Sequence, residues 1–386
     1  MIIVIADNLT CAAEIAGLGR SYGLDTVLLS EVPTVLPQRP LVVIATDTRS
    51  GSEQQAIADT EALCRKLGPA MSTAHQRLVL YKAVDPYMRG HLVGELQAMM
   101  RGTAYQQVVC LPANPSHDLI IRGGCCYVEG TPLDQTPYAA QSDTVIDTAS
   151  VCLRLGITPQ SRIRVPDAVT PDDVRQVVQQ SMQSNNLTLL AGSFDLFAAL
   201  LEYKGYARAE QPDFEGLSRE SSALIVCGSP QSTDISSRPF VRKRDLPLDS
   251  MPRDVFDGSQ GAAYWLANIQ LRHFSRAAIQ PARYGLVLNI PYERSCSRQS
   301  ALRLRTEMAQ VVSQLVEQMQ PAELVIEGGA TAYAIFERQG WRHFVVDSMI
   351  SDGVVRLHLE SLPSMQITFK PGHYPWGDTL FGWPSY

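Results

Sequence analysis

Short runs of consecutive apolar residues, separated by amphipathic segments, constrain the fold of this chain more than any other feature. The first half contains IIVIA at Ile2–Ala6, LVVIAT at Leu41–Thr46 and QVVCLPA at Gln107–Ala113. Strands that are apolar on both faces belong to sheets covered by helices on both sides, and such sheets are mainly parallel. Helical segments such as EQQAIADTEALCRKLG, which begins at Glu53, supply those covers. The pattern predicts an α/β fold.

A second series of apolar runs follows a polar stretch that has neither helical nor strand periodicity. That stretch, Glu202–Ser222, is typical of a connection between domains. A chain of 386 residues is long enough to form two cores. We therefore expect two α/β domains, residues 1–205 and 223–386, joined by a connection at 206–222. Each is expected to contain a mainly parallel sheet flanked by helices, with the active site in the interdomain cleft.

Charge and composition exclude several classes of protein. The net charge is −6 and no dense run of lysine and arginine occurs, which argues against a nucleic-acid partner. No apolar stretch approaches the length of a membrane span, and the N-terminal stretch lacks the pattern of a signal peptide. The eight cysteines include no CxxC pair, which is typical of a reducing compartment and offers no zinc site. We expect a cytoplasmic protein with no membrane partner.

Polar residues gather where the strands of the first half end. They are Asp7, Asn8, Asp47, Arg49, Lys82, Asp85 and Arg89. The carboxyl ends of parallel strands share one edge of a sheet, and open α/β sheets bind ligands there. Arginine binds carboxylates bidentately, whereas Asp and Asn bind hydroxyl groups. Alternatively, these are ordinary turn residues and structural ion pairs, with Thr10 as the cap of the first helix. We favour a site for a small hydroxylated anion.

The corresponding turns of the second half are rich in glycine. They lie at Gly228–Ser229, Gly328–Thr331 and Gly372. Glycine lets backbone amides approach an oxyanion closely, and a helix N-terminus adds a favourable field. Glycine is also common in plain turns, and no Walker loop GxxxxGK[ST] occurs in the chain. Taken together, the three turns favour a phosphate-binding edge, and the two kinds of site suit phosphoryl transfer.

The same segments resemble, in order, motifs of the four-carbon acid sugar kinase family over nearly the whole chain. The matching segments are IADNLTCAAEIAGLG, DTRS, YKAVDPYMRGHLVGEL, LPANP, AGSFDLFAAL, CGSPQSTD, VIEGGATA and LESLPSMQITFKPGHY. The resemblance implies ATP-dependent phosphorylation of a hydroxyl group on threonate, erythronate or 3-oxo-tetronate. It implies ATP and Mg2+ as cofactors, without a dedicated set of metal ligands in the protein, and it makes a homodimer unsurprising.

The resemblance also implies roles for individual residues. The residues expected to bind the sugar acid are Asp7, Asn8, Arg49, Lys82, Asp85 and Arg89. Among them, Asp7 is the first candidate for the general base and Asp85 the second, while Lys82 offsets developing charge. The residues expected to bind the nucleotide are Ser229, Gly328, Gly329, Ala330, Thr331 and Gly372.

The chain departs from the family pattern in both predicted sites. The departing residues are Asn8 and Ala330 in place of aspartates, Cys11 in place of glycine, Pro86-Tyr87 in place of Ser-Thr, and His373-Tyr374-Pro375 in place of Asn-Phe-Gly. They leave open an alternative, a weakly active or non-catalytic paralogue that binds a sugar acid or a nucleotide as a sensor or partner protein. An oxidoreductase is disfavoured, because no GxGxxG follows the first strand.

Overall fold

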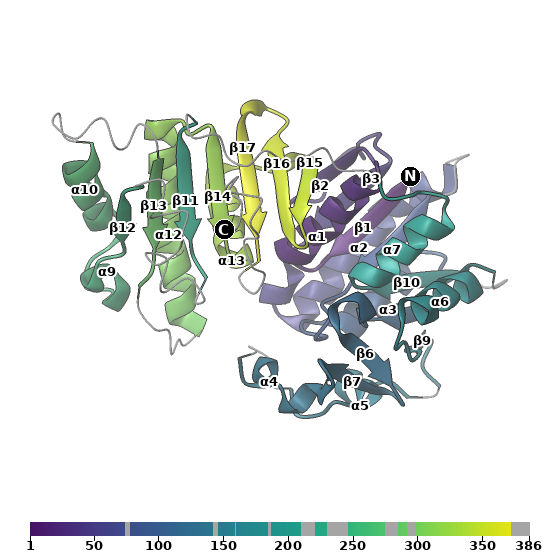
Figure 1. Cartoon of the computed structure of the whole chain (residues 1–386). Coiled ribbons are helices and arrows are strands. Elements are labelled where there is room, and N and C mark those ends of the chain that lie inside the picture. The colour runs from purple at the N-terminus through teal and green to yellow at the C-terminus, as the bar shows by residue number, and fades with distance from the viewer. Residues whose placement is uncertain are drawn as a thin grey trace, which may run out of the picture. The chain divides into compact units, whose positions relative to one another are not determined.

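The computed structural model divides the chain into two units, Met1–Ala209 and Glu210–Tyr386 (Figure 1). It describes residues 1–73, 78–141, 146–158, 160–183, 187–209, 221–229, 246–274, 285–291 and 298–371. Residues 210–220 of the expected connection therefore lie outside the described residues. Each unit contains a mainly parallel sheet accompanied by helices, so the predicted α/β class is confirmed.

Parallel strands form the main sheet of the first unit, in the order β2-β3-β1-β4-β10-β5-β9. Their bounds are β1 (Ile2–Ala6), β2 (Thr26–Leu29), β3 (Leu41–Ala45), β4 (Val79–Ala83), β5 (Gln107–Leu111), β9 (Ile163–Arg164) and β10 (Thr188–Gly192). Every residue of β1 and β3 is buried, as expected for strands with helices on both faces.

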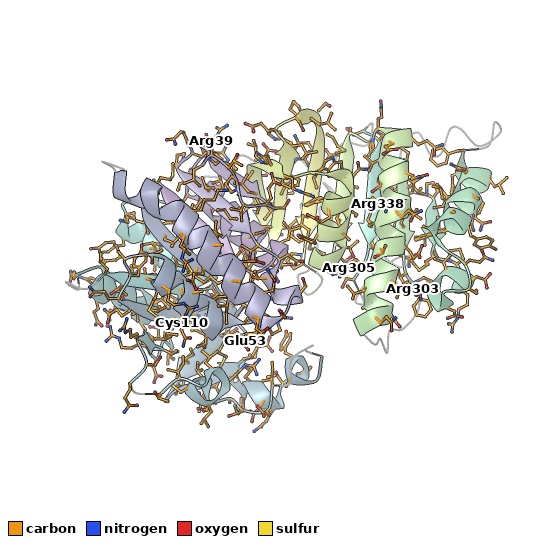
Figure 2. The ribbon with its side chains drawn as sticks, turned by 180° about the vertical axis from the view of Figure 1, so that it is seen from behind. Arg39, Glu53, Cys110, Arg303, Arg305 and Arg338 are labelled. Carbon is orange, nitrogen blue, oxygen red and sulfur yellow. The ribbon has the colours of Figure 1, made fainter. Side chains whose placement is uncertain are left out.

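Helices cover both faces of this sheet. They are α1 (Leu9–Ser21), α2 (Glu53–Thr73), α3 (Leu92–Gly102), α6 (Pro171–Gln183) and α7 (Phe194–Tyr203). Helices α1 and α7 pack together on one face, and α2 packs against α3 on the other (Figures 1 and 2). The short 3-10 helices η1 (Thr48–Ser50) and η2 (Pro115–His117) follow β3 and β5.

A small antiparallel sheet, with strand order β6-β7-β8, is inserted between β5 and β9. Its elements, with two short helices, are β6 (Leu119–Arg122), β7 (Cys125–Val128), β8 (Thr131–Pro132), α4 (Pro137–Gln141) and α5 (Val151–Leu155). This subdomain is not among the two domains that the sequence predicts. The signal was present, because a Gly-Gly pair between two short apolar runs is typical of a hairpin.

The sheet of the second unit has the order β12-β13-β11-β14-β17-β16-β15, in which β16 is antiparallel to both neighbours and the remaining pairings are parallel. Its elements are β11 (Ala223–Cys227), β12 (Leu248–Ser250), β13 (Gly285–Asn289), β14 (Glu323–Glu327), β15 (His343–Ser351), β16 (Val354–Leu359), β17 (Leu362–Lys370), α9 (Arg253–Asp257), α10 (Ala262–His273), α12 (Arg298–Met319) and α13 (Gly329–Gln339). Arg303 of α12 donates to the carbonyl of Val255 at 2.6 Å and so ties α12 to α9 (Figure 2).

None of the helices within the described residues combines the length and the apolar character that crossing a bilayer requires.

Candidate functional site

The register of β1 brings three strand ends of the first unit to one level. Ala6, the last residue of β1, pairs with Ala45 of β3 and with Ala83 of β4. The chain therefore leaves these three neighbouring strands side by side, at the carboxyl edge of the sheet. Asp7 follows β1 directly, and the backbone N–H of Arg49 in η1 donates to the Asp7 carbonyl at 3.1 Å.

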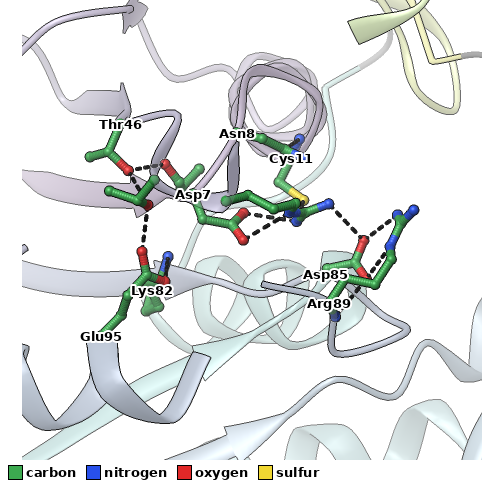
Figure 3. Close-up of polar contacts among 11 residues, drawn as sticks. Asp7, Asn8, Cys11, Thr46, Lys82, Asp85, Arg89 and Glu95 are labelled. Atoms are coloured by element: carbon green, nitrogen blue, oxygen red, sulfur yellow. Dashed lines mark hydrogen bonds and ion pairs between the residues drawn. The ribbon is translucent and has the colours of Figure 1, made fainter. Parts of the chain in front are cut away.

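Four charged residues meet at this edge, and we name them the Asp7–Arg49–Asp85–Arg89 cluster (Figure 3). Arg49 holds Asp7 bidentately, with Nε at 2.9 Å from one carboxylate oxygen and Nη2 at 2.8 Å from the other. Its Nη1 reaches Asp85 Oδ1 at 3.2 Å. Arg89 holds Asp85 in the same bidentate way, at 2.9 and 2.6 Å. The convergence that the sequence predicts is therefore present for these four side chains.

Two arginines keep Asp85 of the cluster ionised. Asp85 is buried, and burial alone would raise its pKa, but Arg49 and Arg89 hold the pKa of Asp85 well below its usual value. The carboxylate also accepts the backbone N–H of Arg89 at 3.1 Å. Desolvation opposes the charge of Arg49, yet Asp7 and Asp85 raise its pKa well above the usual value. The geometry favours a structural role for Asp85 and leaves Asp7 as the candidate base.

Gly90 ends the loop that carries Asp85 and Arg89, and its close packing requires glycine. Its φ is +88°, and an added β-carbon would lie 2.7 Å from Asp7 Oδ2. We expect Gly90→Ala to lose about 1–3 kcal/mol more free energy of unfolding than Gly23→Ala, because both incur the left-handed penalty and only the first overpacks the cluster. Gly23 has a φ of +76° with nothing within 4 Å of an added β-carbon. Urea denaturation of both variants measures the difference, and equal losses would contradict a clash at the cluster.

Lys82 does not join the cluster, although the sequence predicts that it binds the ligand together with it. Its side chain on β4 is 1% exposed, and its ammonium lies 3.0 Å from Glu95 Oε2 of α3. Glu95 is equally buried and also accepts the hydroxyl of Thr48. Burial opposes the charge, but Glu95 and then Asp7 raise the pKa of Lys82. Lys82 thus forms a buried ion pair with Glu95, a residue for which the sequence predicts no role.

Asn8, rather than Thr10, caps α1. The helix begins at Leu9, and the Asn8 side-chain oxygen accepts the backbone N–H of Cys11 at 2.8 Å. The expectation for Thr10 was wrong because the chain turns into the helix one residue after Asn8, so that Thr10 already lies inside it. An aspartate caps a helix as well as asparagine does. The cap therefore explains the presence of a short polar side chain here.

Cys11 lies against the cluster but is chemically shielded. Its sulfur is 3.5 Å from Arg49 Nη2, and burial raises the pKa of the Cys11 thiol to about 12. We expect iodoacetamide at pH 8 to leave Cys11 unmodified while it alkylates the exposed Cys152. Peptide mass spectrometry after digestion measures both sites, and labelling in urea provides the control in which both react. Equal rates at Cys11 and Cys152 in the native protein would contradict this burial.

A second polar group at the same edge was not singled out from the sequence. Ser193, just after β10, donates to Asn114 Oδ1 at 2.7 Å, and the Asp195 backbone N–H donates to the same oxygen at 3.0 Å. Asp195 in turn accepts the backbone N–H of Ser116 at 2.8 Å. The signal was available, since Ser193 follows β10 directly and Asn114 lies three residues after the end of β5, but neither carries a charge that would attract notice.

The loop between Asp85 and Gly90 is held by side chains of the small subdomain. Arg154 of α5 donates to the carbonyls of Tyr87 at 3.3 Å and Met88 at 3.5 Å. The ring of Tyr87 stacks on Tyr138 of α4 with 4.6 Å between centroids. No sequence pattern pointed to Arg154 or Tyr138, because both lie in the subdomain that the sequence analysis missed.

The second unit brings most of the predicted nucleotide residues together. Gly328 precedes α13 with a φ of +107°, and an added β-carbon there would lie 3.5 Å from the backbone N of Ser229. The first turn of α13 contains Gly329, Ala330 and Thr331. The first N–H groups of a helix have no partner within the helix, so they face outward toward an anion. Gly372 lies outside the described residues.

A buried ion pair stands beside this glycine turn and was not predicted. Lys370, the last residue of β17, donates to Glu327 Oε1 at 3.1 Å and to the carbonyl of Pro371 at 3.0 Å. Each side chain is no more than 2% exposed. The Gly328 N–H also donates to the Lys370 carbonyl at 2.9 Å. The pair therefore connects the ends of β14 and β17 next to Gly328.

Comparison with known proteins gives consistent matches. A sugar-binding N-terminal domain family matches residues 2–156. A D-threonate kinase from Cupriavidus necator is 26% identical, over 94% of this chain and 91% of the relative. A D-threonate kinase from Salmonella typhimurium is 23% identical over 98% and 96% of the two chains. A 3-oxo-tetronate kinase from Methylobacterium radiotolerans is 23% identical over 98% and 97%.

Solved structures share the fold at low sequence identity. A Salmonella typhimurium LT2 protein provisionally described as a tRNA synthase has a TM-score of 0.73 at 17% identity, over 99% of this chain and 97% of that one. A Haemophilus influenzae protein, from a family named only as a domain of unknown function, has a TM-score of 0.68 at 16% identity, over 98% of both chains. With a sugar-binding N-terminal domain matched over residues 2–156, the chain is similar over nearly its whole length to D-threonate and 3-oxo-tetronate kinases.

Proposed function

We propose that the chain transfers a phosphoryl group from ATP to a hydroxyl group of a four-carbon sugar acid, of the tetronate or 3-oxo-tetronate type. The Asp7–Arg49–Asp85–Arg89 cluster is the observation that carries this proposal. It lies in the part of the chain that matches a sugar-binding domain, and it combines groups that bind carboxylates with groups that bind hydroxyls. The names of the D-threonate and 3-oxo-tetronate kinases supply the substrate class.

Arg89 is the proposed anchor for the carboxylate of the acceptor. Its side chain is 35% exposed, against 18% for Arg49, so it is the more accessible of the two guanidinium groups. A guanidinium has five N–H donors, and the side chain of Arg89 commits two of them to Asp85. The remaining donors can bind a second carboxylate while Asp85 keeps the side chain in place.

Asp7 is the proposed general base for the attacking hydroxyl. Each of its oxygens accepts one N–H from Arg49, and each has a second acceptor position left for a hydroxyl proton. The bidentate contact fixes the carboxylate, so that a hydroxyl bound there is also oriented. Asp85 acts as a positioning residue in this scheme, because each of its oxygens already accepts two N–H groups, whereas each Asp7 oxygen accepts one. Lys82 contributes through Glu95 rather than by touching the acceptor.

The nucleotide is proposed to bind at the start of α13, against Ser229 and Gly328–Thr331. A helix N-terminus preceded by a glycine of positive φ fits a phosphate group, since no side chain obstructs the backbone amides. The nearby Lys370–Glu327 pair lies next to this turn, and the Gly328 N–H donates to the Lys370 carbonyl. Transfer also requires the acceptor hydroxyl to meet the bound nucleotide in line. That meeting, in a cleft between the two domains, stays a prediction.

Magnesium fits this scheme as part of the nucleotide complex. The described residues contain no group of three or more His, Cys, Asp or Glu side chains arranged to hold a metal ion. Mg2+ commonly keeps several waters and binds through substrate phosphates with few protein carboxylates. The phosphates held at Gly328–Thr331 would therefore supply most of its ligands. When bound, the ion would neutralise the charge of the phosphates.

An ADP-release assay tests the proposal directly. The purified chain is incubated with ATP and Mg2+ and with each tetronic acid and its 3-oxo form in turn. We expect one acid to be turned over at least about tenfold faster than its epimers, because binding contacts at fixed carboxylate and hydroxyl positions discriminate by about 1.4 kcal/mol or more. ATP binding without turnover of any acid would overturn the kinase proposal and favour the alternative, a non-catalytic protein that acts as a sensor or partner.

The alternative, a weakly active or non-catalytic paralogue, has an observation in its favour. Residue 330, in the first turn of α13, is an exposed alanine. The turn therefore has no carboxylate at the position where the family pattern has an aspartate. Asn8→Asp combined with Ala330→Asp tests this reading. If the chain is eroded, we expect the double variant to raise kcat by about tenfold or more, as a restored catalytic contact would. An unchanged kcat would instead point to an adapted specificity.

A further inference from the structure

An aromatic stack connects the small subdomain to the outermost arginine of the cluster. Tyr87 and Tyr138 stack with 4.6 Å between ring centroids and an interplanar angle of 20°. The guanidinium carbon of Arg89 lies 5.6 Å from the centroid of the same Tyr87 ring. Both tyrosines are half-buried, and burial followed by contact with Tyr138 raises the pKa of Tyr87. The three side chains thus form a continuous row from α4 to Asp85.

The backbone of the same loop is held from the same direction. Met88 has a φ of +55°, a conformation that non-glycine residues adopt at a cost. Arg154 of α5 binds the carbonyls of Met88 and its neighbour Tyr87, which stabilises that conformation. Helices α4 and α5 both belong to the small subdomain (Figure 1). One subdomain therefore contacts both the backbone and the side chains of the Asp85–Gly90 loop.

Asp85 binds only the Nε and Nη2 side of the Arg89 guanidinium group. A further contact therefore helps to fix the orientation of the group. The two bonds to Asp85 use Nε and one N–H of Nη2, and the remaining N–H groups of this partly exposed side chain are the donors assigned above to the acceptor. An aromatic ring within about 6 Å of a guanidinium attracts the charged group and so favours one placement of it. The position of that ring depends in turn on Tyr138.

We propose that Tyr138 is a positioning residue that orients Arg89, through Tyr87, for the carboxylate of the acceptor. This inference rests on the proposed function, since it assigns the specificity of the same site to the small subdomain. Tyr138 touches no reacting group in this scheme. Its loss should therefore affect binding of the acid and leave binding of the nucleotide and the chemical step largely intact.

The test compares four variants on whichever tetronic acid the wild-type chain turns over fastest. We expect Tyr138→Ala to raise KM for the acid about tenfold, because a misplaced anchor weakens a charged contact by roughly that factor. KM for ATP and kcat should change less than twofold. Tyr138→Phe, which keeps the ring, should restore KM, and Tyr138→Leu, which keeps apolar volume without stacking, should not. Tyr203→Ala, which removes a tyrosine that is 45% exposed at the end of α7, is the matched control.

The outcomes separate this inference from the proposed function. Turnover by the wild-type chain with an unchanged KM for the acid in both Tyr138→Ala and Tyr138→Leu would overturn the role of Tyr138 alone. An equal rise in the KM values for the acid and for ATP would overturn it too, because that pattern indicates general loss of structure. Absence of turnover by the wild-type chain would overturn the proposed function, and this role with it. Circular dichroism and urea denaturation establish that each variant is folded before its kinetics are read.

Discussion

Arg49→Met loses about 3–5 kcal/mol of the free energy of unfolding, because it leaves two buried carboxylates, Asp7 and Asp85, without their shared partner. The exposed fractions of those side chains are 5% and 3%, so water cannot replace the lost guanidinium. The same variant lowers kcat/KM for the sugar acid by at least about 10²-fold, because the candidate base loses the group that fixes it. Urea denaturation and the ADP-release assay measure the two effects.

Two further variants make this result specific. Arg39→Met removes an arginine at the outer surface of the first unit, whose ion pair with Asp25 leaves both side chains at 35% and 50% exposure (Figure 2). Exposed pairs contribute about 0–1 kcal/mol, so this control should be nearly neutral in both assays. Arg49→Lys keeps the charge but not the bidentate geometry, and we expect an intermediate loss of activity. Wild-type activity in Arg49→Lys would show that the geometry of the cluster does not matter.

Removing either member of the Lys82–Glu95 pair should be as damaging as removing Arg49. Each side chain is 1% exposed and the ammonium lies 3.0 Å from Glu95 Oε2, so a single variant leaves one buried charge alone. We expect Lys82→Met and Glu95→Leu each to lose about 3–5 kcal/mol of the free energy of unfolding. The double variant should be more stable than either single variant, because its interior holds no unpaired charge. Urea denaturation of the four proteins in a double-mutant cycle measures this coupling.

The same cycle decides the role of Lys82. If its ammonium acts only through Glu95, the double variant recovers activity together with stability. If Lys82 binds the acceptor, as the sequence predicts, the double variant is stable but has lost at least about 10²-fold in kcat/KM, the usual cost of a missing charge contact in the transition state. Strict additivity of the two stability losses would contradict a direct ion pair.

Much of the fold could be predicted from local pattern alone. Continuous apolar runs such as Ile2–Ala6 and Leu41–Ala45 became buried parallel strands, because a strand with no polar face can only lie between two layers. The small subdomain escaped prediction, because strands of two to four residues leave too short a periodic signal to outweigh the turns around them. The antiparallel pairing of β15 with β16 could not be predicted, because the direction of a strand depends on its connections rather than on composition.

The sequence likewise predicts some features of the candidate site and not others. The positions of Asp7, Arg49, Asp85 and Arg89 after successive strands were enough to predict that these residues lie close together. Strand ends in a parallel sheet share one edge, whatever their side chains are. The sequence could not show that Lys82 would point to Glu95, since alternate residues of a strand face opposite sides of the sheet and the neighbour on that side comes from α3. Nor could it find Tyr138 and Arg154, which are 51 and 66 residues from their partners in the loop.

The sequence by itself therefore determined the α/β class, the similarity to sugar acid kinases and the charged strand ends, because burial periodicity and short motifs are properties of neighbouring residues. Only the tertiary structure decided which charges pair, which of them are buried, and which subdomain supports the Asp85–Gly90 loop. Those outcomes depend on contacts between residues far apart in the chain. Their energies arise from desolvation and short-range geometry that do not exist until the chain has folded.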